Sequence, residues 1–188
     1  MTTNRSRTLE IVEYDPSWPK VFETLRSRLL LALGDVADSI EHVGSTAVPG
    51  LAAKPIVDVD VVVEADTYVP LAIERLGILG YQHRGDLGIE GREAFDSPAG
   101  SPTHHLYVCG QGSLALANHL TICNHLRRHP EAAMKYGQLK RRLAREFPTE
   151  PARYGDGKTE FLIGLLREAG FREDALRVIV DANRVTSQ

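Results

Sequence analysis

Two aspartates interrupt an otherwise apolar run of β-branched residues. Asp58 and Asp60 lie within the valine-rich segment 56–63. Successive side chains of a β-strand point to opposite faces, so the two carboxylates share one face and the intervening valines occupy the other. Neighbouring like charges on a covered strand are costly unless a cation offsets them. Oxygen-only ligands favour Mg²⁺ or Mn²⁺, so we expect Asp58 and Asp60 to be the catalytic metal ligands of a Mg²⁺- or Mn²⁺-dependent site.

A Gly-Ser pair precedes this strand. Gly44, Ser45 and Thr46 follow a short expected strand, 40–43. A glycine at a strand-to-helix junction lets backbone N–H groups approach a phosphate, and a helix start favours negative charge. We therefore expect these residues to bind phosphate, with Ser45 or Thr46 capping a helical turn. Gly-Ser followed after a dozen residues by Asp-x-Asp on a strand is the pattern of nucleotidyltransferases, in which the turn holds the phosphates of a nucleoside triphosphate.

The alternative for the acidic segment is an edge strand whose carboxylates face water. The valines at 61–63 continue the apolar run without alternation. Such a run suits a strand that is covered on both faces, and so favours burial of the two acids.

Longer motifs surround these residues. The string from His42 to Asp58, His-Val-Gly-Ser-Thr-Ala-Val-Pro-Gly-Leu-Ala-Ala-Lys-Pro-Ile-Val-Asp, closely resembles the GrpB family, a branch of the nucleotidyltransferase-like fold that is sometimes fused to dephospho-coenzyme A kinase. The likeness runs from about Leu9 to Ala169. Shorter motifs occur in the family's order: Tyr14-Asp-Pro-Ser-Trp18, His104-His105-Leu106, Leu126-Arg-Arg-His-Pro130, Tyr136-x-x-Leu-Lys140 and Tyr154-x-x-x-Lys158-x-x-Phe161.

The sequence departs from the family pattern at two places. Cys123-Asn124 replaces an expected Arg-Asp, and Tyr107 replaces a second histidine two residues after His105. An asparagine at 124 can hydrogen-bond but cannot be a charged ligand or a base. Both departures favour a protein that binds a nucleotide without turning it over.

A third catalytic acid is expected on a neighbouring strand, and the candidate strand 103–108 contains none. Either one of its histidines takes that place, or the third ligand comes from Glu93 or Asp96. Paired histidines on a strand point to opposite faces, so only one can line the site. The family likeness favours His105, as a ligand or as a general base toward a hydroxyl, and a purely structural histidine is the alternative.

Basic residues near these motifs are candidates for phosphate binding. Lys54 lies between the turn and the acidic strand, Arg92 follows a glycine-rich turn, and Lys158 belongs to a C-terminal motif. A guanidinium can bind a phosphate bidentately, and an ammonium balances its charge. Ordinary solvated side chains are the alternative for each. The basic run 140–145 is expected on the solvated face of an amphipathic helix, rather than as a contact to RNA.

Length and composition predict one soluble domain. The chain has 188 residues, a hydrophobic fraction of 43% and a net charge of −3. This charge makes a nucleic-acid partner unlikely by comparison with basic nucleic-acid-binding domains. No apolar stretch approaches the ~20 residues of a membrane span, and residues 1–7 lack the apolar core of a secretion signal, so we expect a cytoplasmic protein with reduced cysteines.

Alternating strand and helix patterns, followed by helices only, predict an α/β (α+β) fold with a mixed sheet core and a helical C-terminal layer. The expected core covers 8–110 and the helical layer 113–183, after seven N-terminal residues that we expect to be disordered. Expected strands are 9–14, 40–43, 56–63, 81–84, 93–95 and 103–108; expected helices are 15–33, 67–76, 114–128, 130–147, 152–169 and 173–183.

These patterns together predict a metal-dependent nucleotidyltransferase that acts on a nucleoside triphosphate and a small-molecule acceptor. The alternative is a non-catalytic module for a nucleotide or a ligand similar to coenzyme A. Neither the acceptor nor the oligomeric state follows from the sequence.

Overall fold

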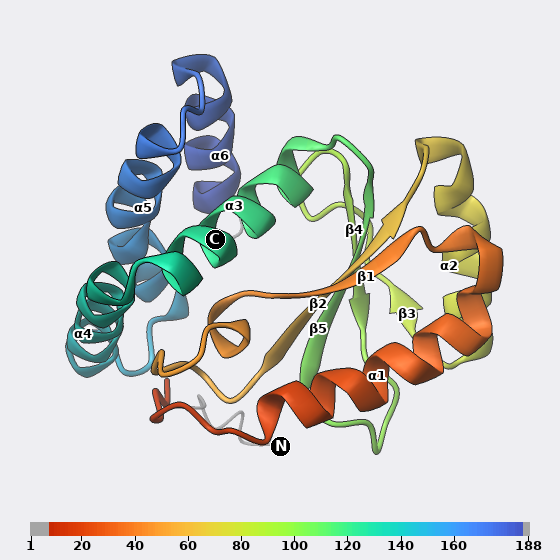
Figure 1. Cartoon of the computed structure of the whole chain (residues 1–188), viewed down its shortest axis with the longest axis horizontal. Helices are drawn as coiled ribbons and strands as arrows, with labels where there is room; N and C mark the ends of the chain where they lie inside the picture. Colours follow the sequence, from red (N-terminus) through yellow and green to blue (C-terminus); the bar gives the residue numbers. More distant parts are fainter. Residues whose placement is uncertain (1–7, 186–188) are drawn as a thin grey trace, which may run out of the picture.

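The computed structural model describes residues 8–185, and residues 1–7, for which we expected disorder, lie outside the described part. One mixed sheet of five strands forms the core in the order β1-β2-β5-β4-β3 (Figure 1). Strands β2 and β5 are parallel, and the other neighbouring strands are antiparallel. The strands are β1 (Ser39–Val43), β2 (Val57–Val63), β3 (Gln82–His83), β4 (Arg92–Asp96) and β5 (His104–Gly110).

Helices cover both faces of this sheet. Helices α1 and α2 lie on one side, and α3 to α6 form a separate group on the other (Figure 1). The helices are α1 (Trp18–Leu33), α2 (Val69–Ile78), α3 (Leu114–Arg128), α4 (Pro130–Glu146), α5 (Pro151–Glu168) and α6 (Glu173–Val185). Within residues 8–185, none of these helices is long and apolar enough to cross a membrane.

The alternation of β2 separates an apolar face from a polar one. Val57, Val59 and Val61 belong to the main core cluster together with the inward side of α1. That side carries Leu25 and Leu29 at the four-residue spacing of a helical stripe. The opposite face of β2 carries the two aspartates and faces the C-terminal helices.

The element boundaries differ from expectation mainly near the N-terminus. The expected strand 9–14 is only an isolated bridge between Val12 and Ala53. Helix α1 begins at Trp18, because Asp15 accepts a hydrogen bond from the backbone N–H of Ser17 at 2.7 Å and forms a turn there. A 3-10 turn at Asp66–Tyr68 precedes α2, which then begins at Val69.

The packing of the core predicts that two leucines of α1 contribute very differently to the free energy of unfolding. Leu29 is 1% exposed and Leu31 is 88% exposed. Leu29→Ala leaves a cavity against the valine face and should lower the free energy of unfolding by about 2–5 kcal/mol. Leu31→Ala, the matched control, should change it by less than about 0.5 kcal/mol. Urea unfolding measures both, and equal losses would contradict this packing.

Candidate active site

The acid pair lies on a central strand. Strand β2 pairs with β1 on one side and β5 on the other, so the alternative of an edge strand facing water is wrong. The parallel register places Asp58 opposite His105 and Asp60 opposite Tyr107. The Nδ1 atom of His105 lies 2.8 Å from Oδ1 of Asp58. Of the two histidines that begin β5, His105, the expected one, is therefore the one that contacts an acid of the pair.

The other histidine of the pair points to the apolar side of the sheet. His104 is buried, and its Nε2 lies 2.8 Å from the hydroxyl of Tyr81. Burial lowers the pKa of His104, which therefore favours the neutral imidazole. His104 is the satisfied structural histidine, as the alternation of the strand requires.

Neither acid of β4 acts as a third partner for Asp58 and Asp60. Glu93 is bonded to His83 at 2.5 Å, and Asp96 pairs with Arg84 at 3.4 Å. Both interactions lie where β3 pairs with β4. The interpretation that Glu93 or Asp96 supplies a third ligand is therefore not supported by this geometry.

Asp60 has no exposed surface. Its Oδ2 lies 2.8 Å from Nδ1 of His119 on α3, whereas its Oδ1 is buried without a hydrogen-bond partner. Burial alone would lower the pKa of His119, but the neighbouring Asp60 outweighs it, and the pKa of His119 is raised. His119 belongs to none of the motifs near the acidic strand, so its contact with Asp60 was not predicted.

Gly44 contacts Asp58 so closely that only a glycine fits. Its φ of +69° and ψ of −168° fall in a region that is essentially restricted to glycine. A Cβ at this position would lie 2.1 Å from Oδ2 of Asp58. The turn and the acidic strand are thus in direct contact, as the Gly-Ser and Asp-x-Asp spacing predicts. The turn itself is a 3-10 turn at Ser45–Ala47 without a side-chain cap, so the predicted capping by Ser45 or Thr46 is wrong.

Side chains from β1 and α3 fix this turn. The Oγ1 of Thr46 lies 3.0 Å from Nε2 of His42. Burial, helped by nearby Arg127, lowers the pKa of His42 to about 4, so the imidazole is neutral near pH 7. Arg127 donates from Nε to the carbonyl of Ala47 at 2.9 Å and from Nη2 to that of His42 at 3.1 Å. Asn124, where the family pattern has an aspartate, accepts a hydrogen bond from Arg127 and supports this contact.

A cavity of about 230 Å³ opens beside Ser45 and Asp58. Lys54, Lys140 and Lys158 all line it. Its full lining is Ser45, Thr46, Ala53, Lys54, Ile56, Asp58, His105, Tyr136, Lys140, Tyr154 and Lys158. The structure thus brings together the turn, one of the two acids, His105 and two of the three expected phosphate-binding cations.

The ammonium groups of these three lysines lie over two tyrosine rings. The ammonium groups of Lys54 and Lys158 lie 4.7 and 4.6 Å from the ring centre of Tyr154. Lys140 lies 4.6 Å from the ring centre of Tyr136 and donates from Nζ to Oγ of Ser45 at 2.8 Å. Cation–π contacts of this kind partly compensate for lost hydration. Lys140 is only 2% exposed, so the expectation that the run 140–145 is a solvated face is wrong at its first residue.

The surroundings of these lysines disfavour the charged ammonium form. Burial first, and then Lys158 and Arg141, lower the pKa of Lys140 to about 7, although Asp58 opposes this shift. Burial and then Lys54 lower the pKa of Lys158 to about 8. Burial also lowers the pKa of Lys54. Three cations that face a single carboxylate, Asp58, leave this cavity with excess positive charge.

Arg92 does not reach this cavity. It is the first residue of β4, is 7% exposed, and lies with its guanidinium 4.4 Å from the ring centre of Tyr107. It lines a different cavity, beyond His119. The structure therefore separates Arg92 from the other candidate phosphate-binding residues, because the glycine-rich turn leads into a covered strand.

The residues present fit a Mg²⁺ or Mn²⁺ ion in one respect. The buried, unpartnered Oδ1 of Asp60 needs a cation or a donor, and Asp58 lies two positions away on the same face. Among the residues that the structure describes, no group of three or more His, Cys, Asp or Glu side chains is arranged to hold a metal. Magnesium commonly binds one or two carboxylates and takes its other ligands from substrate phosphates and water. Asp58, which lines the cavity of the three lysines, and Asp60, two positions away on the same face, suit that mode.

A family model described as "GrpB protein" matches residues 8–168. The chain belongs to the GrpB family. It is 36% identical over 156 residues to the UPF0157 protein YqkA of Bacillus subtilis, and this match covers 83% of the chain and 46% of YqkA. The chain thus spans less than half the length of that GrpB relative.

Solved structures agree with this assignment. The conserved protein GrpB from Enterococcus faecalis matches with a TM-score of 0.76 and 33% identity, over 89% of this chain and 98% of that one. The Cid1 poly(U) polymerase bound to magnesium and 3'-dATP matches with a TM-score of 0.53 and 14% identity, over 79% of this chain and 50% of that one. The second likeness shows the fold alone, and confirms that the chain has the expected nucleotidyltransferase-like architecture.

Gly44 gives a direct test of the contact between turn and acid. Gly44→Ala adds a Cβ that collides with Asp58 as well as straining the backbone, whereas at Gly50, whose φ is +77°, a Cβ meets nothing within 4 Å. Gly50→Ala should therefore cost only the backbone strain, about 1–2 kcal/mol, and Gly44→Ala should cost more. Urea unfolding of both variants measures this difference. Equal losses would mean that Gly44 does not contact Asp58 in this way.

Proposed function

We propose that this GrpB protein is a metal-dependent nucleotidyltransferase, which transfers a nucleotidyl group from a nucleoside triphosphate to a small-molecule acceptor. The observation that carries the proposal is the convergence of Lys54, Lys140 and Lys158 on one cavity beside Ser45 and Asp58. The nucleotidyltransferase-like fold supports it but does not by itself define an activity.

The charge of the cavity favours a polyanion. Folding brings three ammonium groups together and lowers the pKa values of all three, which costs free energy in the ligand-free protein. A triphosphate would restore the lost favourable interactions and would be held by charge-assisted hydrogen bonds. Because Lys140 already donates to Ser45, both side chains face the space where we place the phosphates.

We propose that Asp58 and Asp60 are the residues that would hold Mg²⁺ or Mn²⁺. The ion, when bound, stabilises charge on the phosphate oxygens. The lysines neutralise the β- and γ-phosphates, and Gly44 keeps the turn against Asp58. An acceptor hydroxyl then forms a bond to the α-phosphorus, the bond from that phosphorus to the bridging oxygen breaks, pyrophosphate leaves, and the hydroxyl proton passes to water.

His105 has a positioning role in this arrangement. Its Nδ1 lies 2.8 Å from Oδ1 of Asp58, which fixes that carboxyl group in one orientation. It lines the cavity with Asp58, where a third acid would otherwise add negative charge. We propose that it replaces this acid and keeps the site more favourable for phosphate.

A nucleotide-binding protein without turnover is the second candidate. The observation that favours it is that each acid has one oxygen bonded to a histidine and that no third metal-binding side chain joins them in the described part of the chain. The phosphate cavity would be the same, and only the chemistry would differ. A ligand similar to coenzyme A, which also carries phosphates, fits this candidate.

The proposed setting is the cytoplasm, where nucleoside triphosphates are available. Cys109 and Cys123 are both free and buried, as expected of reduced thiols. A nucleic-acid acceptor is disfavoured, because the net charge of the chain is −3.

Two substitutions separate phosphate binding from metal binding. Lys140→Met should weaken ATP binding about ten- to a hundredfold, since it removes a charge-assisted contact. Lys135→Met, at an exposed position on the same helix, is the control and should have no effect. Asp58→Asn should abolish the gain in ATP affinity that Mg²⁺ provides, while metal-free ATP binding is retained or strengthened. Isothermal titration calorimetry measures each affinity, and unchanged values for Lys140→Met would exclude the cavity as the phosphate site.

The lowered lysine pKa values predict proton uptake on binding. Lys140 and Lys158 have pKa values of about 7 and 8, so at about pH 8 both are partly neutral. A triphosphate favours the charged forms, so ATP should bind with uptake of protons and with an affinity that falls as the pH rises above 7. In the ligand-free protein the unfolded chain holds more protons on these lysines than the folded one, so this contribution to stability increases with pH above about 7.

Titrations near pH 8 in buffers of different ionisation enthalpy measure the proton uptake. Lys140→Met should reduce it, while Lys135→Met should not. Other charged or titratable groups also face the cavity and can contribute to the proton uptake, namely Lys54, Asp58, His105, Tyr136 and Tyr154. The difference between the protein and Lys140→Met gives the share of Lys140. Proton release on binding, instead of uptake, would contradict the prediction.

Turnover decides between the two candidate functions. The protein is incubated with each nucleoside triphosphate and Mg²⁺ or Mn²⁺ against a panel of hydroxylated metabolites, and pyrophosphate release is measured. Release that requires both an acceptor and Asp58 supports nucleotidyl transfer. Thermal stabilisation by the nucleotide without pyrophosphate release supports the binding protein.

A further inference from the structure

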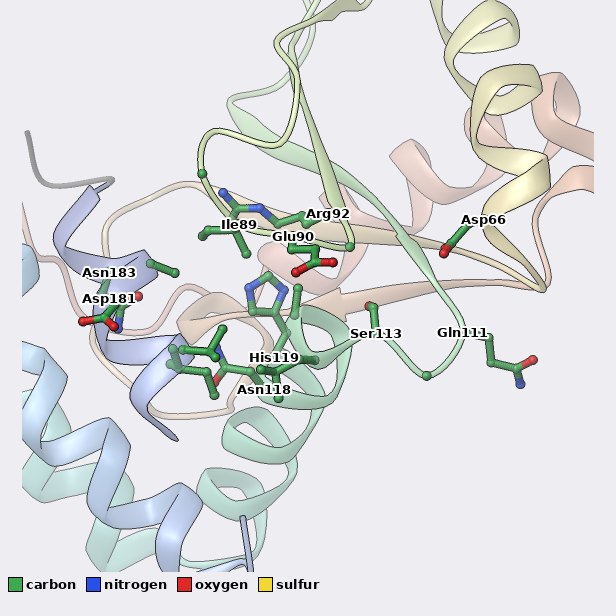
Figure 2. A pocket seen from close by; sticks show the side chains of 18 residues that line it. Asp66, Ile89, Glu90, Arg92, Gln111, Ser113, Asn118, His119, Asp181 and Asn183 are labelled. Atoms are coloured by element: carbon green, nitrogen blue, oxygen red, sulfur yellow. The ribbon is translucent and has the colours of Figure 1, made fainter. Parts of the chain in front are cut away.

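A second cavity lies beyond the acid pair, on the side away from the lysines. Its volume is about 700 Å³, and loop 88–91, the start of β4, the turn 111–113 and helices α3 and α6 line it (Figure 2). This volume is in the range of cavities that bind small molecules. None of the three lysines of the phosphate cavity lines it, so its ligand must be recognised by other groups.

Arg92 is the buried cation of this second cavity. It is 7% exposed, and its Nε has no hydrogen-bond partner. The contact with the ring of Tyr107, at 4.4 Å, offsets only part of the cost of burying the charge. A guanidinium stays charged in proteins and binds a carboxylate with two parallel hydrogen bonds. Arg92 therefore keeps one buried donor, Nε–H, that no group in the described part of the protein satisfies and that an anion could accept from.

Unpartnered acceptors lie beside this unpartnered donor. Among the described side chains, the buried nitrogen and oxygen atoms without a partner are Nε of Arg92, Oδ1 of Asn118 and Oδ1 of Asp60. Arg92 and Asn118 both line the second cavity, and Asp60 is bonded to His119, which also lines it. Figure 2 shows Arg92, Glu90 and His119 among the side chains that line this cavity. A ligand that fills this space has to offer both an anionic group and hydrogen-bond donors.

A smaller cavity shares lining residues with both sites. Its volume is about 190 Å³, and it shares Ser45 and Tyr136 with the phosphate cavity. It shares Asn118 and His119 with the second cavity. A molecule that extends from Arg92 past Asn118 and His119 would therefore approach the residues around Ser45.

We propose that the second cavity binds the acceptor of the reaction, and that this acceptor is a small hydroxycarboxylate. The proposal deepens the function proposed above and rests on it. The carboxylate is bound by Arg92, a hydroxyl donates to Oδ1 of Asn118, and another hydroxyl reaches past His119 toward the α-phosphate. Its oxygen forms the bond to phosphorus, with loss of pyrophosphate and release of the proton to water.

The rim of the cavity favours a single negative charge. Glu90, Asp66 and Asp181 line it, and carboxylates around a cavity repel a dianion more strongly than a monoanion. A phosphate monoester carries about two charges near pH 7 and a carboxylate only one. The acids at the rim also accept hydrogen bonds from hydroxyl groups. A polyol that ends in a carboxylate satisfies all of these groups.

NMR gives a direct test through the side-chain Nε–Hε signal of Arg92. The full-length protein is titrated with D-gluconate, with sorbitol as the uncharged polyol of the same length, and with sorbitol 6-phosphate as the dianion. Gluconate should shift the Arg92 signal in a saturable manner, and sorbitol should not. A response to sorbitol 6-phosphate that is as strong as that to gluconate would overturn the choice of a carboxylate. No response to any of the three would overturn the acceptor site.

Three variants distinguish recognition from a folding defect. Arg92→Gln should weaken gluconate binding about ten- to a hundredfold. Arg84→Gln, at an exposed position directly after β3, is the matched control and should not change it. Glu90→Gln should strengthen gluconate binding, a gain that a damaged fold cannot produce. Unchanged binding in both Arg92→Gln and Glu90→Gln would overturn the assignment.

A parallel ATP titration separates this inference from the proposed function. If ATP does not bind while the Arg92 signal responds to gluconate, the nucleotidyltransferase proposal fails and the carboxylate site remains. If ATP binds and gluconate accelerates pyrophosphate release in a manner that Arg92→Gln abolishes, both are supported. If ATP binds and gluconate changes neither the signal nor the rate, the acceptor site alone is wrong.

Discussion

The carboxyl group of Asp60, which has no exposed surface, has to find its partners inside the protein. A buried charge of this kind is tolerated only when other groups compensate for its lost hydration. His119 on α3 supplies one hydrogen bond, and the positive charge of Arg92 acts on the same neighbourhood. The C-terminal helices are therefore held over the sheet by a polar contact as well as by apolar packing. That contact keeps the acid pair close to both cavities.

Charge is distributed unevenly along this face of the sheet. Three lysines surround the end near Asp58, the fully buried Asp60 occupies the middle, and Arg92 lies beyond it. The valine face of β2, by contrast, packs against α1 in a continuous apolar core. Stability comes mainly from that core, because isolated buried charges cost more than they return. The polar face accordingly has the properties of a binding surface.

The sequence predicted the parts of the site that depend on local pattern. Alternation along β2 placed Asp58 and Asp60 on one face, and the same rule separated His104 from His105. The contact of Gly44 with Asp58 followed from the Gly-Ser and Asp-x-Asp spacing. Strand alternation was sufficient for the first two, whereas the Gly-Ser and Asp-x-Asp spacing was informative because it resembles the nucleotidyltransferase pattern.

The parts that depend on long-range packing were missed or misplaced. Lys140 belongs to a helical run rich in basic residues, and nothing local shows that its first member turns inward to Ser45, 95 residues earlier in the chain. The Tyr-x-x-Leu-Lys motif was the available signal, since Tyr136 supports the ammonium group. His119 and Arg92 likewise acquire their roles from the packing of α3 and β4 against β2.

In the site that we propose, histidines where a third acid is expected change the balance between metal binding and phosphate binding. His105 and His119 each bond one carboxyl oxygen of the acid pair, so two carboxylates have to serve where a third would add negative charge. Lower negative charge weakens the attraction for a divalent cation and strengthens the attraction for phosphate. Three lysines converge on the same cavity. In this protein, charge neutralisation of a bound triphosphate would therefore depend on the helical layer at least as much as on the metal.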